Sequence, residues 1–317
     1  MTSVKKPKKC LDIGCNKCIF VVNCKLKGCV SLNSKVVISA DSTCDLSNEI
    51  LDKYGIPICP LFVVMNDRPL RDGIDTKPQD VFDYTEQTGK LAKTTAPNVA
   101  DYTDFFREIT SEGQSVVHFS ISAPMSVSYS NACTAAADFE NVHIIDSMNL
   151  STGIGLLVLK ACDLSAQGLS AAEIADKIND LREYVDATFV IDTLKYLHKG
   201  GRCSAVAALG ANLLKLKPCI EVRDGKMAVG KKYRGKSPDV LEKYVAEMLA
   251  NIDDIDLDRV FVTHTCDDTA LVDAVKAQVK SIGGFKEVLE TRAGCTISVH
   301  CGPGTLGILF VRKTKLK

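Results

Sequence analysis

From Val36 onward the chain alternates short apolar stretches, rich in β-branched residues, with longer amphipathic stretches. The short stretches have the length and composition of buried β-strands. We predict strands at residues 36–40, 58–65, 115–121, 142–146, 187–191, 259–264 and 297–300.

The longer stretches repeat apolar residues at intervals of three and four positions, which predicts helices with one buried face. One of them begins with Ser170 and Glu173, a pair of side chains that forms a capping box at a helix start. Apolar strands separated by helices are typical of βαβ units, so the pattern predicts an α/β fold with largely parallel sheets. The predicted helices cover residues 78–86, 99–111, 128–138, 151–166, 170–184, 238–251 and 269–282.

Small polar residues follow several predicted strands. Asp41 and Ser42 follow the first strand, and Ser147 follows the fourth. In an open α/β sheet, the loops at the carboxyl ends of parallel strands form the ligand site. The same residue types also cap helices, so these three side chains fit either role.

The composition excludes several classes of protein. The 317 residues include 39 basic and 39 acidic side chains, and 46% of all residues are hydrophobic. These values are ordinary for a globular protein and exclude a mostly disordered chain. A net charge of zero gives no electrostatic reason to expect a nucleic-acid partner. No apolar run approaches the roughly 18 residues of a membrane-spanning helix, so we expect no stable membrane insertion.

The first 35 residues differ from the rest, because they hold eight lysines, one acidic residue and five of the fourteen cysteines. Cys15 and Cys18 form a C-x-x-C pair, and Cys24 and Cys29 follow it. Four thiolates could hold zinc or an iron–sulfur cluster. Familiar zinc modules add a second C-x-x-C pair or two histidines, which are missing here. We interpret residues 1–34 as a flexible Cys/Lys-rich leader without a metal and keep the four-cysteine site as the alternative.

The other nine cysteines are scattered, mostly within apolar runs. Cysteines in such runs behave as small buried hydrophobic residues in a reducing compartment. We therefore expect the protein to be cytoplasmic.

A segment from Gly230 to Ser237 matches the phosphate-loop pattern G-x-x-x-x-G-K-S, with Lys236 at the lysine position. In a true phosphate loop a buried strand leads in and backbone N–H groups wrap the phosphates. Here the preceding residues resemble the second arm of a hairpin with its turn at Asp224 and Gly225. An ATP-dependent enzyme that uses this segment is therefore the alternative function.

The five histidines show no metal-ligand spacing, so we expect no metal site among them. His118 and His143 lie within predicted strands and are interpreted as structural. His264 and His300 each end a predicted strand. His300 is the better ligand candidate, because the glycine-rich loop after it lets backbone approach a ligand.

Arg202 follows two glycines and precedes an apolar stretch that predicts a helix start near residue 204. A cation at a helix N-terminus is disfavoured by the helix dipole unless an anion lies nearby. Arg202 therefore fits either an anion or partner contact, or a solvated charge.

Five short motifs follow one another along the body of the chain. They are residues 41–46 (D-S-T-C-D-L), 93–97 (K-T-T-A-P), 121–129 (I-S-A-P-M-S-V-S-Y), 192–202 (D-T-L-K-Y-L-H-K-G-G-R) and 300–304 (H-C-G-P-G). Their order and spacing resemble the DegV family, whose members include the fatty-acid-binding subunits of bacterial fatty acid kinase. The resemblance extends over about residues 35–313.

The resemblance implies two α/β lobes, at residues 35–155 and 156–313, with one long-chain fatty acid buried between them. By motif position, the hydroxyls of Thr94 and Ser126 would hold the carboxylate, with His300 beside them. The neighbouring motif positions, which could support this site, are Thr95, Ser122, Arg202 and Gly302.

The resemblance also implies a protein with no cofactor and no catalytic residues of its own. In the kinase system a separate ATP-binding subunit phosphorylates the fatty acid carboxylate to an acyl phosphate, so such a kinase subunit is the expected partner. Two positions depart from the family motifs: Val127 stands where members have glycine, and Ala96 where they have glutamine. These departures bear on acyl-chain preference and on docking of the kinase.

Overall fold

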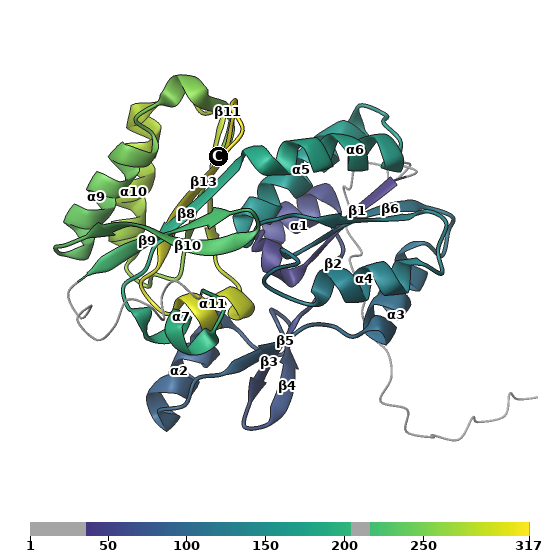
Figure 1. Cartoon of the computed structure of the whole chain (residues 1–317), viewed down its shortest axis with the longest axis horizontal. Coiled ribbons are helices and arrows are strands. Elements are labelled where there is room, and N and C mark those ends of the chain that lie inside the picture. The colour runs from purple at the N-terminus through teal and green to yellow at the C-terminus, as the bar shows by residue number, and fades with distance from the viewer. Residues whose placement is uncertain (1–35, 204–215, 317) are drawn as a thin grey trace, which may run out of the picture. The chain divides into compact units, whose positions relative to one another are not determined.

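The computed structural model describes residues 36–203 and 216–316. Within these ranges the chain forms three β-sheets that helices connect and cover (Figure 1). The cysteine-rich leader, and with it the alternative metal site, lies outside the described residues, as does the predicted helix start near residue 204.

The first sheet is wholly parallel and has the strand order β2-β1-β6-β7. Helices α1 (Asn48–Tyr54) and α4 (Ser128–Ala136) follow β1 and β6 as crossover connections. Parallel neighbours require such crossovers, so the predicted α/β class and the parallel first sheet are confirmed. The strands are β1 (Val36–Asp41), β2 (Ile58–Cys59), β6 (Ser115–Ser120) and β7 (Val142–Asp146).

The second sheet has the order β10-β9-β8-β13-β11-β12 and is mostly antiparallel. The prediction of a largely parallel sheet in this half is therefore wrong. Only β11 and β12 pair in parallel, and they are the two strands that helix α10 (Thr269–Ile282) joins. The strands are β8 (Val185–Val190), β9 (Lys217–Arg223), β10 (Lys226–Tyr233), β11 (Ile255–His264), β12 (Glu287–Arg292) and β13 (Leu306–Arg312).

The physical reason for the antiparallel pairing lies in the connections. A two-residue turn at Asp224 and Gly225 joins β9 to β10, and so short a turn can only join antiparallel strands. This hairpin was predicted from the sequence and is confirmed. Strand β13, which the predicted strands did not include, runs antiparallel to both of its neighbours.

A third, small sheet has the order β4-β3-β5 and is antiparallel. The predicted strand at residues 58–65 is in fact two strands, because Pro60 has no N–H to donate to a ladder and lies at the break. Strand β2 joins the first sheet and β3 joins the third. The strands of this sheet are β3 (Phe62–Met65), β4 (Arg68–Arg71) and β5 (Lys93–Thr95).

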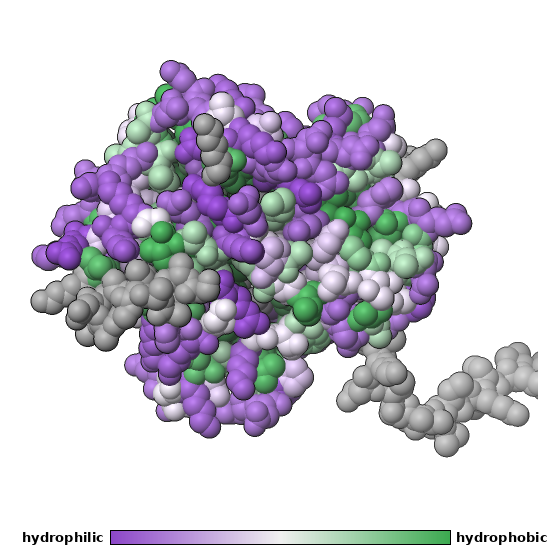
Figure 2. All heavy atoms as spheres, viewed as in Figure 1, coloured by the Kyte–Doolittle hydropathy of each residue, from purple (hydrophilic) through white to green (hydrophobic). Residues whose placement is uncertain are grey.

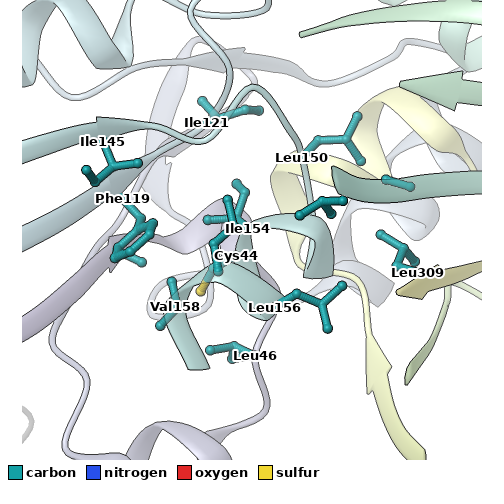
Figure 3. Packing of buried hydrophobic residues seen from close by; sticks show 14 of the residues in the cluster. Cys44, Leu46, Phe119, Ile121, Ile145, Leu150, Ile154, Leu156, Val158 and Leu309 are labelled. Atoms are coloured by element: carbon teal, nitrogen blue, oxygen red, sulfur yellow. The ribbon is translucent and has the colours of Figure 1, made fainter. Parts of the chain in front are cut away.

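Helix α5 (Thr152–Ala166) packs against β1 and β6 of the first sheet and against β8 and β13 of the second (Figure 1). Its sequence is apolar almost all round, as a helix buried on both sides requires. Ile154 and Val158 lie one turn apart, while Leu156 lies toward Leu309 of β13 (Figure 3). The predicted lobe boundary between residues 155 and 156 thus falls inside a helix that both sheets share.

Helix α11 (Cys295–Cys301) replaces the strand that we predicted at residues 297–300. Thr296, Ile297 and Val299 are β-branched and favour a strand by propensity, but every residue of the helix except His300 is buried by its neighbours. Tertiary packing overrides propensity here. Helix α11 packs against α2 (Pro78–Thr88), α7 (Leu194–Gly200), β3 and β5.

The remaining helices pack beside helices already named, next to α4, α5 and α10 respectively. They are α3 (Val99–Ile109), α6 (Ala171–Leu181) and α9 (Ser237–Met248), with short 3-10 turns at η1 (Ser42–Cys44), η2 (Arg182–Tyr184) and η4 (Ile252–Asp254). The face in Figure 2 is mostly hydrophilic, with only small separated hydrophobic patches. Among the described helices, none combines the length and the apolar character that crossing a membrane requires.

None of the nine described cysteines forms a disulfide, and seven of them are buried, as predicted. Cys133 and Cys162 are only half-buried. Burial raises the pKa of the Cys301 thiol to about 12, so this cysteine behaves as a small hydrophobic residue. In the described part of the chain, no three His, Cys, Asp or Glu residues gather as a metal site would need.

Candidate functional site

A cavity of about 380 Å³ lies where α11, β5 and the loop after β6 meet. Its volume falls in the usual range of small-molecule sites, about 300–1,000 Å³. Residues from both 35–155 and 156–313, the ranges of the two predicted lobes, line it. The polar wall residues are Thr94, Thr95, Ser126, Arg202, Thr296 and His300, and the apolar ones are Leu61, Ala96, Ile121, Ala123, Pro124, Met125, Val127, Leu150, Met227, Ile297 and Cys301.

Thr94 and His300 meet at the wall of this cavity. Thr94 lies on β5, and its Oγ1 is 3.0 Å from Nε2 of His300 on α11. The distance is that of a hydrogen bond, whose direction depends on which ring nitrogen carries the proton. Two of the three predicted carboxylate-site residues are thus in direct contact.

The other ring nitrogen of His300, Nδ1, is buried and has no hydrogen-bond partner among the described residues. The ring packs against the backbone of Gly200, where a Cβ atom would lie 2.4 Å from Nδ1. Only glycine therefore lets the ring occupy this position. Burial, together with the charge of Arg202, lowers the pKa of His300 to about 4, so the ring is neutral at physiological pH.

Ser126 lines the same cavity from the loop that precedes α4. Its Oγ accepts the backbone N–H of Ser128 at 3.2 Å and lies 2.9 Å from the Ser128 hydroxyl. If the Ser128 hydroxyl is the donor, the proton of Ser126 is left for a ligand in the cavity. Ser128 was not among the predicted site residues, although its two-residue spacing from Ser126 at a helix start is a signal for such a turn.

Thr95 and Arg202, two of the predicted supporting residues, also line the cavity wall. Both are exposed, so they lie at its solvent side. Arg202 follows the C-terminus of α7, and its guanidinium donates to the Gly200 carbonyl at 2.8 Å. A cation at a helix C-terminus is favoured by the helix dipole, and this position keeps a positive charge near the cavity.

Ser122 and Gly302 are not part of the cavity wall, and their polar groups have other partners. The Ser122 hydroxyl donates to the Gly225 carbonyl at 2.6 Å, which ties the loop after β6 to the turn of the β9–β10 hairpin. The Gly302 N–H donates to the Ser298 carbonyl at 2.9 Å, and the Gly302 carbonyl accepts the Thr265 hydroxyl at 2.7 Å. Both residues shape the surroundings of the cavity rather than its wall.

The polar residues after the first and fourth strands serve the fold. Asp41 is fully buried and accepts the Tyr102 hydroxyl at 2.7 Å and the Ile121 N–H at 3.1 Å. His118 lies 3.2 Å from the same carboxylate, which confirms the structural interpretation of this histidine. Ser147 donates to the Asn149 carbonyl two residues on.

The segment that matches the phosphate-loop pattern does not form a phosphate loop. Gly230 lies within β10, and Lys232 and Tyr233 of the segment pair with β9 in an antiparallel ladder. A backbone engaged in a ladder cannot wrap phosphates with its N–H groups. Ser237, at the magnesium-ligand position of the pattern, donates to Asp192 at 3.4 Å instead.

Most apolar residues of the cavity wall were not predicted from the sequence. Leu61, Met227 and Ile297 carry no motif and come from three separate parts of the chain. Ile297 and Cys301 are one helical turn apart on α11, a signal that was hidden because the segment was interpreted as a strand. Thr296 also lines the cavity, and its buried hydroxyl has no partner among the described residues.

The chain thus has an α/β fold with a cavity lined by residues from α11, β5, β10 and the loop after β6. A family model described as an uncharacterised protein of the DegV family matches residues 35–313, and the chain belongs to this family. A DegV domain-containing protein of Clostridium acetobutylicum is 30% identical over 287 residues, which cover 88% of this chain and 99% of the relative.

Solved structures of other proteins are also similar to this chain. A DegV family protein from Thermus thermophilus, described by its fatty acid binding, superposes with a TM-score of 0.81 at 26% identity and covers 87% of this chain and 99% of its own. A stearic acid-binding protein from Eubacterium ventriosum has a TM-score of 0.75 at 30% identity and covers 87% of this chain and 98% of its own. The family resemblance that the five motifs indicated is thereby confirmed.

Proposed function

We propose that this protein binds one long-chain fatty acid in the cavity, with the carboxylate held by Thr94, Ser126 and His300. The observation that carries the proposal is the contact between Thr94 and His300 on the wall of an otherwise largely apolar cavity. Relatives at 26% and 30% identity that are named for fatty acid binding support it.

The hydrogen-bond partners of the two ring nitrogens indicate which of them carries the proton of the neutral His300. A buried N–H without an acceptor costs more than a buried lone pair without a donor, and Nδ1 has no acceptor among the described residues. The neutral ring therefore carries its proton on Nε2 and donates it to the Thr94 oxygen. The Thr94 hydroxyl proton is then free to donate to a carboxylate oxygen of the ligand. His300 thus orients the donor of Thr94 without becoming charged.

The apolar residues of the cavity wall bury the acyl tail of the ligand. Burying about 14 methylene groups at about 0.8 kcal/mol each contributes on the order of 11 kcal/mol. Immobilising the ligand and ordering the site offset part of this gain. The carboxylate must recover its hydrogen bonds, since an unsatisfied buried charge would cancel much of the remainder. The hydroxyls of Thr94 and Ser126 are suited to this task.

The proposal includes a partner: an ATP-dependent fatty acid kinase subunit that converts the presented carboxylate into an acyl phosphate. The exposed side chains of Thr95 and Arg202 at the solvent side of the cavity support it, because they leave the head of the ligand within reach of a second protein. A cytoplasmic location agrees with this role and with nine described cysteines that form no disulfide.

The test of lipid binding is organic-solvent extraction of the purified protein followed by mass spectrometry. We expect one long-chain fatty acid per protein in the wild type and substantially less in Thr94→Val. Recovery of no fatty acid, together with no binding of added palmitate by delipidated protein, would contradict the proposal. For the kinase step, an ATP-binding subunit of a fatty acid kinase is added with ATP and the acyl phosphate is trapped with hydroxylamine. The chain with ATP alone should give none.

A further inference from the structure

Two buried carboxylates converge on the first turn of α11, the helix that carries His300. Asp45 accepts the backbone N–H of Gly294 at 2.9 Å. Asp72 accepts the N–H of Cys295 at 2.8 Å with one oxygen and that of Thr296 at 2.9 Å with the other. Three successive donors at the start of the helix, which have no partner within it, are thus all satisfied by side chains from the other half of the chain.

The packing at this point is tight. Asp45 and Asp72 are only 5% and 4% exposed. A Cβ atom on Gly294 would lie 3.0 Å from the nearer Asp45 oxygen and 3.4 Å from that of Asp72, so the two carboxylates enclose this glycine. Buried carboxylates are costly unless hydrogen bonds and a positive potential offset the cost, and the start of a helix supplies both. This geometry fixes where α11 begins.

Both carboxylates are held in turn by residues near the cavity. The Ser42 hydroxyl donates to Asp72 at 3.3 Å and accepts the N–H of the wall residue Leu61 at 3.1 Å. The Ser151 hydroxyl, just before α5, donates to Asp45 at 2.5 Å. Burial, with the charge of Asp72 adding to it, raises the pKa of Asp45 to about 8.

We infer that Asp72, supported by Asp45, is a positioning residue of the fatty acid site: it holds the start of α11 so that His300 meets Thr94 at hydrogen-bond distance. Thr296 and His300 are one turn apart on this short helix, so a displaced first turn would move the His300 ring. This inference rests on the proposed function, because it assigns a role in recognising the ligand's carboxylate. We expect the displaced helix to weaken binding of the ligand's carboxylate and to leave the apolar contacts with the acyl tail unchanged.

The test substitutes Asp72→Asn, which nearly preserves size but directs an amide NH₂ group at one backbone N–H. Binding of palmitic acid and of the corresponding fatty alcohol is measured on delipidated protein. We expect the affinity for the acid to fall by about tenfold or more, as for the loss of one charge-assisted hydrogen bond, and that for the alcohol by less than about threefold. The His300 ring resonances of the ligand-free protein should also shift.

The matched control is Asp268→Asn. Asp268 caps α10 by accepting the Leu271 N–H at 3.1 Å, so this variant also removes a helix-capping carboxylate, but on a helix that does not line the cavity. It should change neither the acid-to-alcohol ratio nor the His300 resonances. If Asp72→Asn does not fold, Ser42→Ala replaces it, with an effect on the acid of about threefold in the same direction.

Either an unchanged acid-to-alcohol ratio or unmoved His300 resonances, in whichever variant folds, would overturn the inference. The NMR comparison uses protein without ligand, so it separates two failures. Wild-type protein that binds neither compound refutes the proposed function, whereas His300 resonances that stay fixed refute the positioning role of Asp72.

Discussion

Thr94 and His300 stand 206 positions apart in the chain, yet Oγ1 of the threonine lies 3.0 Å from Nε2 of the histidine. One comes from the edge of a small sheet and the other from a buried seven-residue helix. The contact joins the two segments that the family motifs assigned to separate lobes. In the proposed function, this contact lets the neutral histidine orient the threonine hydroxyl toward the ligand's carboxylate.

The first prediction concerns the Thr94 hydroxyl. Thr94→Val keeps the shape of the side chain but removes the donor, and a hydrogen bond to a charged acceptor contributes about 1.5–3 kcal/mol. Affinity for palmitic acid, measured by calorimetry on delipidated protein, should fall by about 10- to 150-fold. Thr94→Ser keeps the hydroxyl and should stay within about threefold of the wild type. Equal losses in the two variants would show that the hydroxyl is not the relevant group.

A second prediction separates Ser126 from its neighbours. Ser126→Ala removes a hydroxyl from the cavity wall and should weaken binding of the acid by about tenfold while hardly affecting the fatty alcohol. Ser130→Ala is the control, because Ser130 is exposed on the same helix region and donates to the Val127 carbonyl at 2.9 Å. Thermal melting of both variants checks that the fold is intact. A loss in the control as large as that in Ser126→Ala argues against a ligand contact.

The third prediction is a pH dependence. The pKa of His300 is lowered to about 4 by burial and by Arg202, from an ordinary value near 6.5. The unfolded chain therefore takes up this proton first as the pH falls, so the contribution of His300 to the free energy of unfolding is lost between about pH 6.5 and pH 4. His300→Gln should lose less stability over that interval. An NMR titration of the ring, assigned with this variant, should show no protonation above pH 5; a midpoint near 6.5 contradicts the assignment.

The fourth prediction concerns the segment from Gly230 to Ser237. Lys236 is exposed, directly precedes α9 and does not line the cavity. Lys236→Ala should leave the affinity for palmitic acid unchanged, and the wild-type chain should show no saturable ATP binding in a fluorescent-nucleotide titration. Micromolar ATP binding that Lys236→Ala abolishes would revive the enzyme alternative.

The sequence predicted the α/β class, the parallel first sheet and the β9–β10 hairpin, because apolar periodicity and turn chemistry are local signals. The antiparallel pairing of β13 was not predictable in this way, since it depends on which distant strands lie beside it. Helix α11 was not predicted for a related reason. Its β-branched residues favour a strand, and the carboxylates that accept its first backbone N–H groups lie more than 200 positions away in the chain.

The candidate site could likewise be predicted only in part from the sequence. The family motifs pointed to Thr94, Ser126 and His300, and all three line one cavity. The motif positions Ser122 and Gly302 do not, because their hydrogen bonds are used within the fold. The apolar wall, with Leu61 and Met227, carries no motif, since any hydrophobic side chain of suitable size can fill such a position.

The proposed function requires a fatty acid carboxylate to lie at Thr94, Ser126 and His300. The most direct test is the ¹³C NMR signal of carboxyl-labelled palmitate bound to delipidated protein. We expect one bound carboxyl resonance whose pKa lies below that of the free acid in water, because hydrogen bonds to the ionised form favour that form. The position of this resonance should change in Thr94→Val and in Ser126→Ala. A bound carboxyl signal that titrates like that of the free acid, and is the same in the wild type and both variants, would contradict it.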